Sequence, residues 1–251
     1  DWLLKHQLSE QNGWRPEDPA AGGWGYWHEI PTRPQGNSEH HELLSSNLSA
    51  TLFAVGALKL AGLAPDHVAF IQARQFVERC QNDDGGFFLT PTNPVQNKAG
   101  MDAHNRPRSY ASATANGVRL LLRLGGSAAR VTSARRWLEQ HVGAPGQAGD
   151  FPAERQFARD GSRFYSAWTE AHAFLLLGTT ELQTSAGPRP WGQVFADALV
   201  REQQPDGSFV NTATDLREDD PLVATPMALS ALALARRALT GDLGTAVRME
   251  R

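Results

Sequence analysis

The sequence contains very little cysteine and no concentration of charge of one sign. Cys80 is the single cysteine among 251 residues, which excludes an intrachain disulfide and a paired-thiolate metal site. The 24 Lys and Arg residues are scattered and nearly balanced by 27 Asp and Glu residues, for a net charge of −3. Charge alone therefore gives no basis for binding nucleic acid or an anionic membrane.

Long apolar runs are also lacking. The stretch Met227 to Ala235 is one of the longest, and Ser230 interrupts it. A membrane-spanning helix needs about 20 apolar residues, so we predict no transmembrane segment. The chain begins at Asp1 and reads as helix from Trp2, so we expect it to start inside a longer gene product. Any signal peptide would lie upstream, which leaves a cytoplasmic and an exported location both open.

The sequence instead contains an internal repeat. Similar hexapeptides start at residues 2, 76, 137 and 198, and most of them close an amphipathic stretch. Each is soon followed by glycine or aspartate and then by an aromatic residue. These pairs are Gly13-Trp14, Gly86-Phe87, Asp150-Phe151 and Gly207-Ser208-Phe209, of which the third is the weakest copy.

A second, more apolar helix is expected after each of these turns. The four predicted spans are 46–62, 109–125, 163–178 and 222–238, and three of them end on glycine. A helix that is apolar on most faces is buried on most faces, whereas an amphipathic helix covers one side only.

The pattern thus predicts an all-α fold of about four helix pairs, with the apolar helices as an inner ring and the amphipathic helices as an outer ring. This α/α toroid is expected to form one domain over residues 1–240, followed by a tail at 241–251. A helix bundle or an open superhelix also satisfies the pattern, so ring closure is left open.

The turn sequences resemble those of a known group of proteins. Gln81 to Phe87 and Gln204 to Phe209 are similar to the QW-type repeat of squalene cyclases and protein prenyltransferases, and Gln7 to Trp14 is a looser copy. The whole chain resembles bacterial prenyltransferase and squalene oxidase repeat proteins. That resemblance implies about six helix pairs in a complete toroid, so the chain is expected to be a partial or a small one.

The chemistry that the resemblance implies is only partly represented. A class II terpene cyclase uses a DxDD motif, in which a protonated aspartic acid protonates an alkene. The nearest match is Arg217 to Asp220, where arginine replaces the first aspartate. Asp219 and Asp220 are therefore weak catalytic candidates, and the alternative is that they cap the next helix.

A protein prenyltransferase would require a zinc site and a cluster of cations for the diphosphate. Cys80 ends an outer helix, so we interpret it as a buried apolar residue. Arg106 and Arg108, near Tyr110, are the candidate cations at the rim. We predict no metal site and no cofactor.

Three histidines are further candidates for metal binding or catalysis. His40 and His41, between Glu39 and Glu42, point about 100° apart on a helix and fit a solvated loop better than a metal site. His172 lies in the most polar-aromatic of the inner helices and is a weak catalytic candidate, with a core role as the alternative.

We expect a central cavity that binds an apolar or isoprenoid-like small molecule, since aromatic walls suit apolar ligands. The predicted lining is aromatic, and plain packing between the rings is the alternative. These residues are Tyr110, Phe164, Tyr165 and Trp168.

Three other functions remain open. A diverged terpene cyclase or prenyltransferase would use Asp219 or Asp220 as the acid. A protein-binding scaffold is known from the toroids of complement-type proteins, whose Cys-Gly-Glu-Gln stretch is absent here, so a protein partner stays open. A polysaccharide lyase would find suitable residue types in His104 to Arg106 and Tyr110.

Overall fold

The computed structural model describes residues 1–34, 42–213 and 216–241, of which helices are the main element. The helices are α1 (Trp2–Lys5), α2 (Leu48–Leu60), α3 (Val68–Arg79), α4 (Ala111–Leu124), α5 (Ala128–His141), α6 (Gln156–Asp160), α7 (Arg163–Leu177), α8 (Trp191–Glu202) and α9 (Pro221–Thr240). Short 3₁₀ turns occur at Glu10–Asn12, Glu42–Leu44, Pro94–Gln96 and Ala153–Arg155. A small antiparallel hairpin of β1 (Glu181–Thr184) and β2 (Gly187–Pro190) pairs Glu181 with Pro190.

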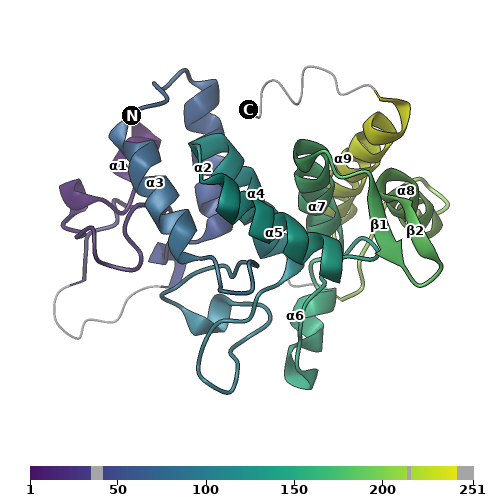
Figure 1. Cartoon of the computed structure of the whole chain (residues 1–251). Coiled ribbons are helices and arrows are strands. Elements are labelled where there is room, and N and C mark those ends of the chain that lie inside the picture. The colour runs from purple at the N-terminus through teal and green to yellow at the C-terminus, as the bar shows by residue number, and fades with distance from the viewer. Residues whose placement is uncertain (35–41, 214–215, 242–251) are drawn as a thin grey trace.

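The helices form an arc of two rows. The helices α2, α4, α7 and α9, which we call the inner helices, pack side by side in that order. The helices α3, α5 and α8 lie behind them as outer helices: α3 contacts α2 and α4, α5 contacts α4, and α8 contacts α7 and α9. Figure 1 shows this progression from α1 to α9, with the connecting loops and α6 gathered at one end of the helices. The predicted α/α-toroid class with four inner helices is confirmed.

Local sequence signals explain where the inner helices begin and end. Asn47 caps α2, because its side chain accepts a hydrogen bond of 2.8 Å from the N–H of Ala50. Gly125 and Gly178 end α4 and α7 in the left-handed conformation, with φ of 68° and 65°. Of the predicted tail at 241–251, only Gly241 lies within the described residues. The β hairpin was not predicted.

The turns between outer and inner helices repeat with the same hydrogen bonds. In three of the four turns a glutamine side chain donates to a glycine carbonyl four or more residues later, and the N–H of the next aromatic residue donates to a threonine hydroxyl of the inner helix. The first bond joins Gln7 to Gly22, Gln81 to Gly85 and Gln203 to Gly207. The second joins Trp24 to Thr51, Phe87 to Thr114 and Phe209 to Thr225.

This geometry corrects the sequence alignment of the first turn. The aromatic residue equivalent to Phe87 is Trp24, not Trp14, because residues 9–21 loop out. The backbone pairs of Leu8 with Gly22 and Gly23 close that loop. In the third turn Gly146 stands at the aromatic position, and its N–H meets the Glu170 carboxyl at 3.3 Å instead of a threonine.

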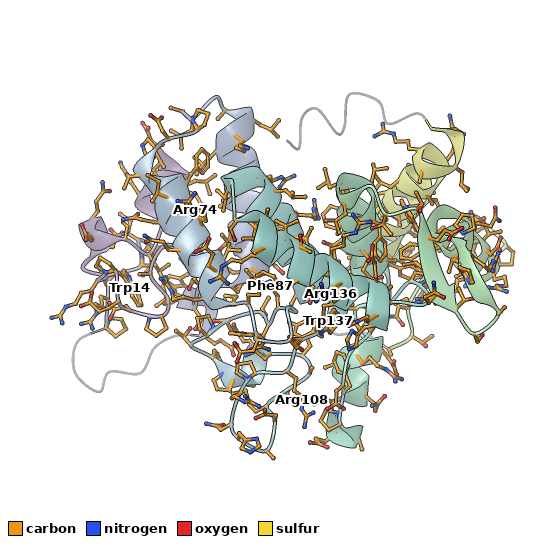
Figure 2. The ribbon with its side chains drawn as sticks, in the orientation of Figure 1. Trp14, Arg74, Phe87, Arg108, Arg136 and Trp137 are labelled. Carbon is orange, nitrogen blue, oxygen red and sulfur yellow. The ribbon has the colours of Figure 1, made fainter. Side chains whose placement is uncertain are left out.

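The core is continuous between the two rows of helices. Phe76, Phe87, Phe174 and Phe195 are fully buried in it. Figure 2 labels Phe87 and Trp137, which lie near each other where the outer helix α5 meets the loop end of the inner row. A smaller apolar cluster forms under the looped-out segment of the first turn and contains Leu8, Trp14, Ala20 and Ala21.

Helix α9 differs from what we expected of apolar runs. Its 20 residues are long and apolar enough to cross a membrane by length and composition, with 28% of the window buried. The small residues Ala224, Ala228 and Ala231 are buried where α9 packs on α7 and α8. Its opposite face leaves Leu222 and Leu229 exposed, at 83% and 50%. Core helices of soluble proteins share this composition, so composition alone does not identify a membrane helix.

Candidate functional site

The inner helices bring a polar and aromatic group of side chains together, although no two of its helices are adjacent in sequence. We call it the inner-face cluster, and it comprises Ser49, Phe53, Asn116, Arg119, Tyr165, Trp168, Thr169 and His172. Ser49 and Phe53 come from α2, Asn116 and Arg119 from α4, and the others from α7.

A chain of hydrogen bonds joins the three helices of the cluster. The Tyr165 hydroxyl lies 2.9 Å from Ser49 Oγ and accepts a hydrogen bond of 2.9 Å from Asn116 Nδ2. Thr169 Oγ1 donates to Asn116 Oδ1 at 2.6 Å and accepts from Arg119 Nη1 at 3.1 Å. Asn116, Arg119 and Thr169 are buried, so these bonds satisfy groups that water does not reach. The network fixes the spacing of α2, α4 and α7.

Aromatic rings stand beside this network. The Trp168 ring stacks on Phe53 with centroids 6.0 Å apart and meets Tyr165 edge-on at 5.9 Å. The Arg119 guanidinium carbon lies 5.1 Å from the Trp168 ring centre, within the range of a cation–π contact. Phe53 is 53% exposed, so this side of the cluster is open to solvent.

An apolar cavity of about 360 Å³ adjoins the cluster through Phe53. The small residues Ala50, Ala54 and Ala57 of α2 leave room for it, and Trp24 and Tyr26 form part of its wall. Its volume lies within the range of small-molecule sites, about 300–1,000 Å³. The cluster and the cavity together form one aromatic surface along α2.

Positive charge gathers around His172. Its Nδ1 donates to the Trp168 carbonyl oxygen at 3.1 Å. Burial, and then the charges of Arg119 and Arg123, lower the pKa of His172 to about 3, so the imidazole is neutral near pH 7. Lys59 Nζ donates to the Arg123 carbonyl oxygen at 2.7 Å, and burial followed by the Arg123 charge lowers the pKa of Lys59. Three cations thus flank the aromatic surface.

A buried carboxyl group lies on a different side of α7. Glu170 accepts a hydrogen bond of 2.5 Å from Ser166 Oγ and one from the Gly146 N–H. Burial raises the pKa of Glu170 to about 8. Glu170 and His172 do not share a helix face, as their spacing predicts.

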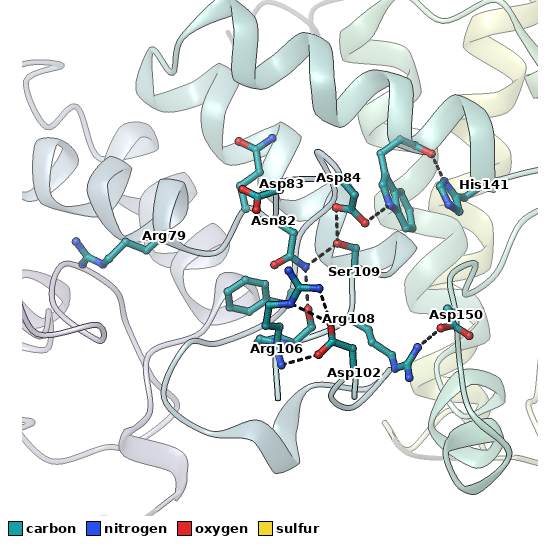
Figure 3. Close-up of a pocket in the computed structure, with 14 residues that line it drawn as sticks. Arg79, Asn82, Asp83, Asp84, Asp102, Arg106, Arg108, Ser109, His141 and Asp150 are labelled. Carbon is teal, nitrogen blue, oxygen red and sulfur yellow. Dashed lines mark hydrogen bonds and ion pairs between the residues drawn. The ribbon is translucent and has the colours of Figure 1, made fainter. Parts of the chain in front are cut away.

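A second, polar cavity of about 570 Å³ lies among the loops between α3 and α5 (Figure 3). Asp84 accepts hydrogen bonds from Ser109 Oγ at 2.9 Å and from Trp137 Nε1 at 3.1 Å. Arg106 pairs with Asp102 at 2.9 Å, and Arg108 pairs with Asp150. This cavity is lined by four carboxylates (Asp83, Asp84, Asp102 and Asp150) and three guanidinium groups (Arg79, Arg106 and Arg108). Asp84 bonds to neutral donors, so the lining carries one more acid than base.

The four aromatic residues predicted to bind a ligand divide into two pairs. Tyr165 and Trp168 belong to the inner-face cluster. Tyr110 and Phe164 are each 1% exposed and pack against phenylalanines of the turns, with ring centroids 6.0 Å from Phe151 and 5.6 Å from Phe209. Burial raises the pKa of the Tyr110 hydroxyl. Ligand binding by any of the four stays a prediction.

The acidic candidates lie at the start of α9. Asp220 caps this helix by accepting a hydrogen bond of 2.9 Å from the Leu222 N–H. Helix capping was the predicted alternative to a catalytic role for this residue. Asp219 is exposed and lies 3.6 Å from Arg217. Their neighbour Glu218 is fully buried and accepts from the backbone N–H groups of Phe164 and Tyr165, at 3.1 and 2.7 Å. Glu218, which was not predicted to have a role, thus holds the start of α7.

The remaining candidates are placed as follows. Cys80 is buried, and burial raises the pKa of its thiol. His40 and His41 lie outside the described residues. Arg106 and Arg108 line the loop cavity and not the inner face. No group of three or more His, Cys, Asp or Glu side chains suited to a metal occurs within residues 1–34, 42–213 and 216–241.

Phe53, Asn116 and Arg119 were not predicted as site residues. A signal for the last two existed: Ser112, Asn116, Arg119 and Arg123 form a polar stripe along one face of an otherwise apolar helix. Each position is a single polar residue in the sequence, and the stripe becomes a site only because α2 and α7 bring partners to it.

The arrangement of the helices was compared with known proteins. Candida albicans protein geranylgeranyltransferase-I, solved in complex with GGPP, matches with a TM-score of 0.54 over 94% of this chain, at 16% identity. The chain has the α/α-toroid fold. It spans 59% of the length of that prenyltransferase chain. Neither a protein-family model nor a curated protein matches the sequence. The predicted toroid is therefore shown, and the closer resemblance to squalene oxidase repeat proteins stays a prediction.

Proposed function

We propose that this toroid binds an apolar, isoprenoid-like ligand along the aromatic surface of α2 and α7. The observation that carries the proposal is the placement of Trp168, between the Arg119 guanidinium and the exposed ring of Phe53, next to an apolar cavity. A half-exposed aromatic stack beside an apolar cavity is the arrangement that a chain-like apolar molecule covers favourably.

The polar atoms of the cluster favour an apolar ligand over a polar one. Asn116 and Thr169 bond to each other and to the neighbouring helices, so they offer few groups to a ligand. Specificity would therefore come from the shape of the aromatic surface. Covering the exposed part of one phenylalanine contributes up to about 1.5–3 kcal/mol, which corresponds to about tenfold or more in affinity.

The cations near His172 favour a ligand with an anionic end. Lys59 of α2 and Arg123 of α4 are half-buried, so a phosphate or diphosphate group could meet them, whereas Arg119 is buried against Thr169 and Trp168. The matched prenyltransferase was solved with GGPP, which makes this compound a suitable probe. Likeness of fold does not transfer an activity, so binding and conversion need separate measurements.

The test is isothermal titration of the purified chain with geranylgeranyl diphosphate, geranylgeraniol and inorganic pyrophosphate, with and without magnesium. Phe53→Ala is expected to weaken binding of both geranylgeranyl compounds about tenfold. The matched control is Phe157→Ala, since Phe157 is 61% exposed on the distant helix α6. Arg123→Gln is expected to weaken only the diphosphate, with Arg74→Gln on α3 as its control.

Mass spectrometry of the same mixtures reports any product, which would indicate a diverged enzyme. The proposal is refuted if none of the three compounds binds, or if Phe53→Ala and Phe157→Ala bind the diphosphate equally well. Pyrophosphate binding alone, without binding of geranylgeraniol, would also refute the apolar surface as the main site.

A further inference from the structure

The hydrogen bonds of the inner-face cluster run in one direction. Arginine only donates, so the Arg119 guanidinium donates to Thr169 Oγ1 at 3.1 Å. The single hydroxyl hydrogen of Thr169 then goes to Asn116 Oδ1, which lies 2.6 Å away. This bond fixes the orientation of the Asn116 amide, because Thr169 holds its oxygen and its NH₂ group therefore points the other way. The network thus starts at a buried guanidinium and runs through Asn116 toward α2.

The Asn116 amide directs both of its hydrogens at hydroxyl groups. Its Nδ2 donates to Ser49 Oγ at 3.2 Å and to the Tyr165 hydroxyl at 2.9 Å. The two hydroxyl oxygens lie 2.9 Å apart, so one of them donates to the other. Two hydrogens of the amide and one of each hydroxyl are thus available for the three hydrogen bonds of this triangle. One O–H is left over, and it has no acceptor among the described residues.

A third hydroxyl beside this pair does not absorb the surplus. Burial, and then the neighbouring Tyr165 hydroxyl, raise the pKa of the Tyr26 phenol against the effect of a hydrogen bond with Ser49. Tyr26 brings one further hydrogen together with one further hydrogen bond, so one O–H still stays unused. Tyr26 also lines the apolar cavity and is 56% exposed. The unused O–H therefore lies where the cavity meets the aromatic surface.

We propose that the aromatic surface binds an apolar molecule that carries an uncharged acceptor oxygen (an ether, ester or carbonyl), which accepts a hydrogen bond from the unused O–H. This ligand class rests on the proposed function, since it describes what the same surface binds. A pure hydrocarbon would cover the hydroxyl and separate it from water without pairing it, which weakens binding. An acceptor oxygen on the ligand removes that penalty.

This oxygen site is distinct from the cations that favour an anionic end. Asn116 and Arg123 are seven residues apart on α4, and Ser49 and Lys59 are ten residues apart on α2. At about 1.5 Å per residue, the hydroxyl groups lie roughly 10–15 Å along the helices from the cations. An uncharged ligand therefore tests the hydroxyl groups and leaves the cations out of the measurement.

The test compares geranylgeranyl methyl ether, whose oxygen only accepts, with the hydrocarbon in which a methylene group replaces that oxygen. Both compounds are titrated into the whole chain, and quenching of tryptophan fluorescence reports binding. The ether is expected to bind about fivefold more tightly, the equivalent of one hydrogen bond of roughly 1 kcal/mol. Phe53→Ala is expected to weaken binding of both compounds alike, because its ring contacts the apolar chain and not the oxygen.

Asn116→Asp is the decisive variant, since it keeps the shape of the side chain and supplies fewer hydrogens. As a carboxylate the new side chain donates none, and as a protonated acid it donates one in place of two, so in either state every O–H of the pair has an acceptor. The ether is therefore expected to lose its advantage over the hydrocarbon. Retained binding of the hydrocarbon shows that the surface is intact. Asn105→Asp is the matched control, because Asn105 lies in an exposed turn.

A preference for the ether in the unaltered chain and in Asn105→Asp, together with its loss in Asn116→Asp, supports the proposal. Equal affinity for both compounds in the unaltered chain overturns it and leaves the proposed function intact. A preference that persists in Asn116→Asp overturns it as well, because the oxygen is then recognised elsewhere. If neither compound binds to the unaltered chain, the proposed function and this ligand class fail together.

Discussion

Substituting the repeated glutamines Gln7, Gln81 and Gln203 tests how each turn is joined to the next outer helix, because the three substitutions are expected to destabilise the protein to different degrees. Gln81→Ala removes an amide that donates to Arg130 and to Ser133, and an oxygen that accepts from Arg130 Nη1 at 3.0 Å. At roughly 1 kcal/mol net for each of these hydrogen bonds, the loss in the free energy of unfolding is about 2–3 kcal/mol. Gln7→Ala is expected to cost a similar amount, because Gln7 is 3% exposed.

Gln203→Ala is the matched comparison, since it removes the same bond within the turn and no bond between helices. Its expected cost is below about 0.5 kcal/mol, as for other surface substitutions. Urea denaturation followed by circular dichroism gives the three values, and an unchanged m-value shows that the unfolded states are comparable. Equal losses for Gln81→Ala and Gln203→Ala would refute the reasoning, because the amide would then act only within its own turn.

Three further predictions concern single positions. Glu218→Ala is expected to lower the free energy of unfolding by about 3 kcal/mol, because two N–H groups at the start of α7 lose a charged acceptor. A loss below about 1 kcal/mol in urea denaturation would contradict this expectation. The pKa of Glu170 is raised to about 8 on folding, so the unfolded state binds fewer protons between the ordinary value of 4.5 and 8 and stability falls as the pH rises through that window. Glu170→Gln is expected to flatten this fall in melting experiments from pH 5 to 8, and an unchanged profile would contradict it. Gly117→Ala is expected to destabilise by about 1–3 kcal/mol, since the new Cβ would lie 2.5 Å from the Phe87 ring, whereas Gly56→Ala, measured beside it, is not.

The inner helices were predictable because their signal is local and repeated. The spans expected at 109–125 and 163–178 agree with α4 and α7 to within two residues, since apolar periodicity and a closing glycine both lie within one segment. The first turn was aligned wrongly because Gly13-Trp14 and Gly23-Trp24 are both glycine–tryptophan pairs, which the sequence alone does not tell apart. Only the bond from Trp24 to Thr51 distinguishes them.

The site was less predictable. Tyr165 and Trp168 were expected on an aromatic wall, and the structure joins them to Ser49, Phe53 and Asn116 from helices far away in sequence. No spacing rule relates residues that are 49 or more positions apart, because their distance depends on how whole helices pack.

By itself, the sequence determined that this chain is helical, that its helices alternate between apolar and amphipathic, and that glycine turns separate them, since each property depends on neighbouring residues. The tertiary structure alone decided which polar residues meet. It turned Glu218 into the acceptor at the start of α7 while its neighbour Asp219 stayed exposed. It gave Gln81 a partner helix and left Gln203 without one among the described residues. The physical reason is that burial and hydrogen-bond partners are properties of packed helices and not of the residues that compose them.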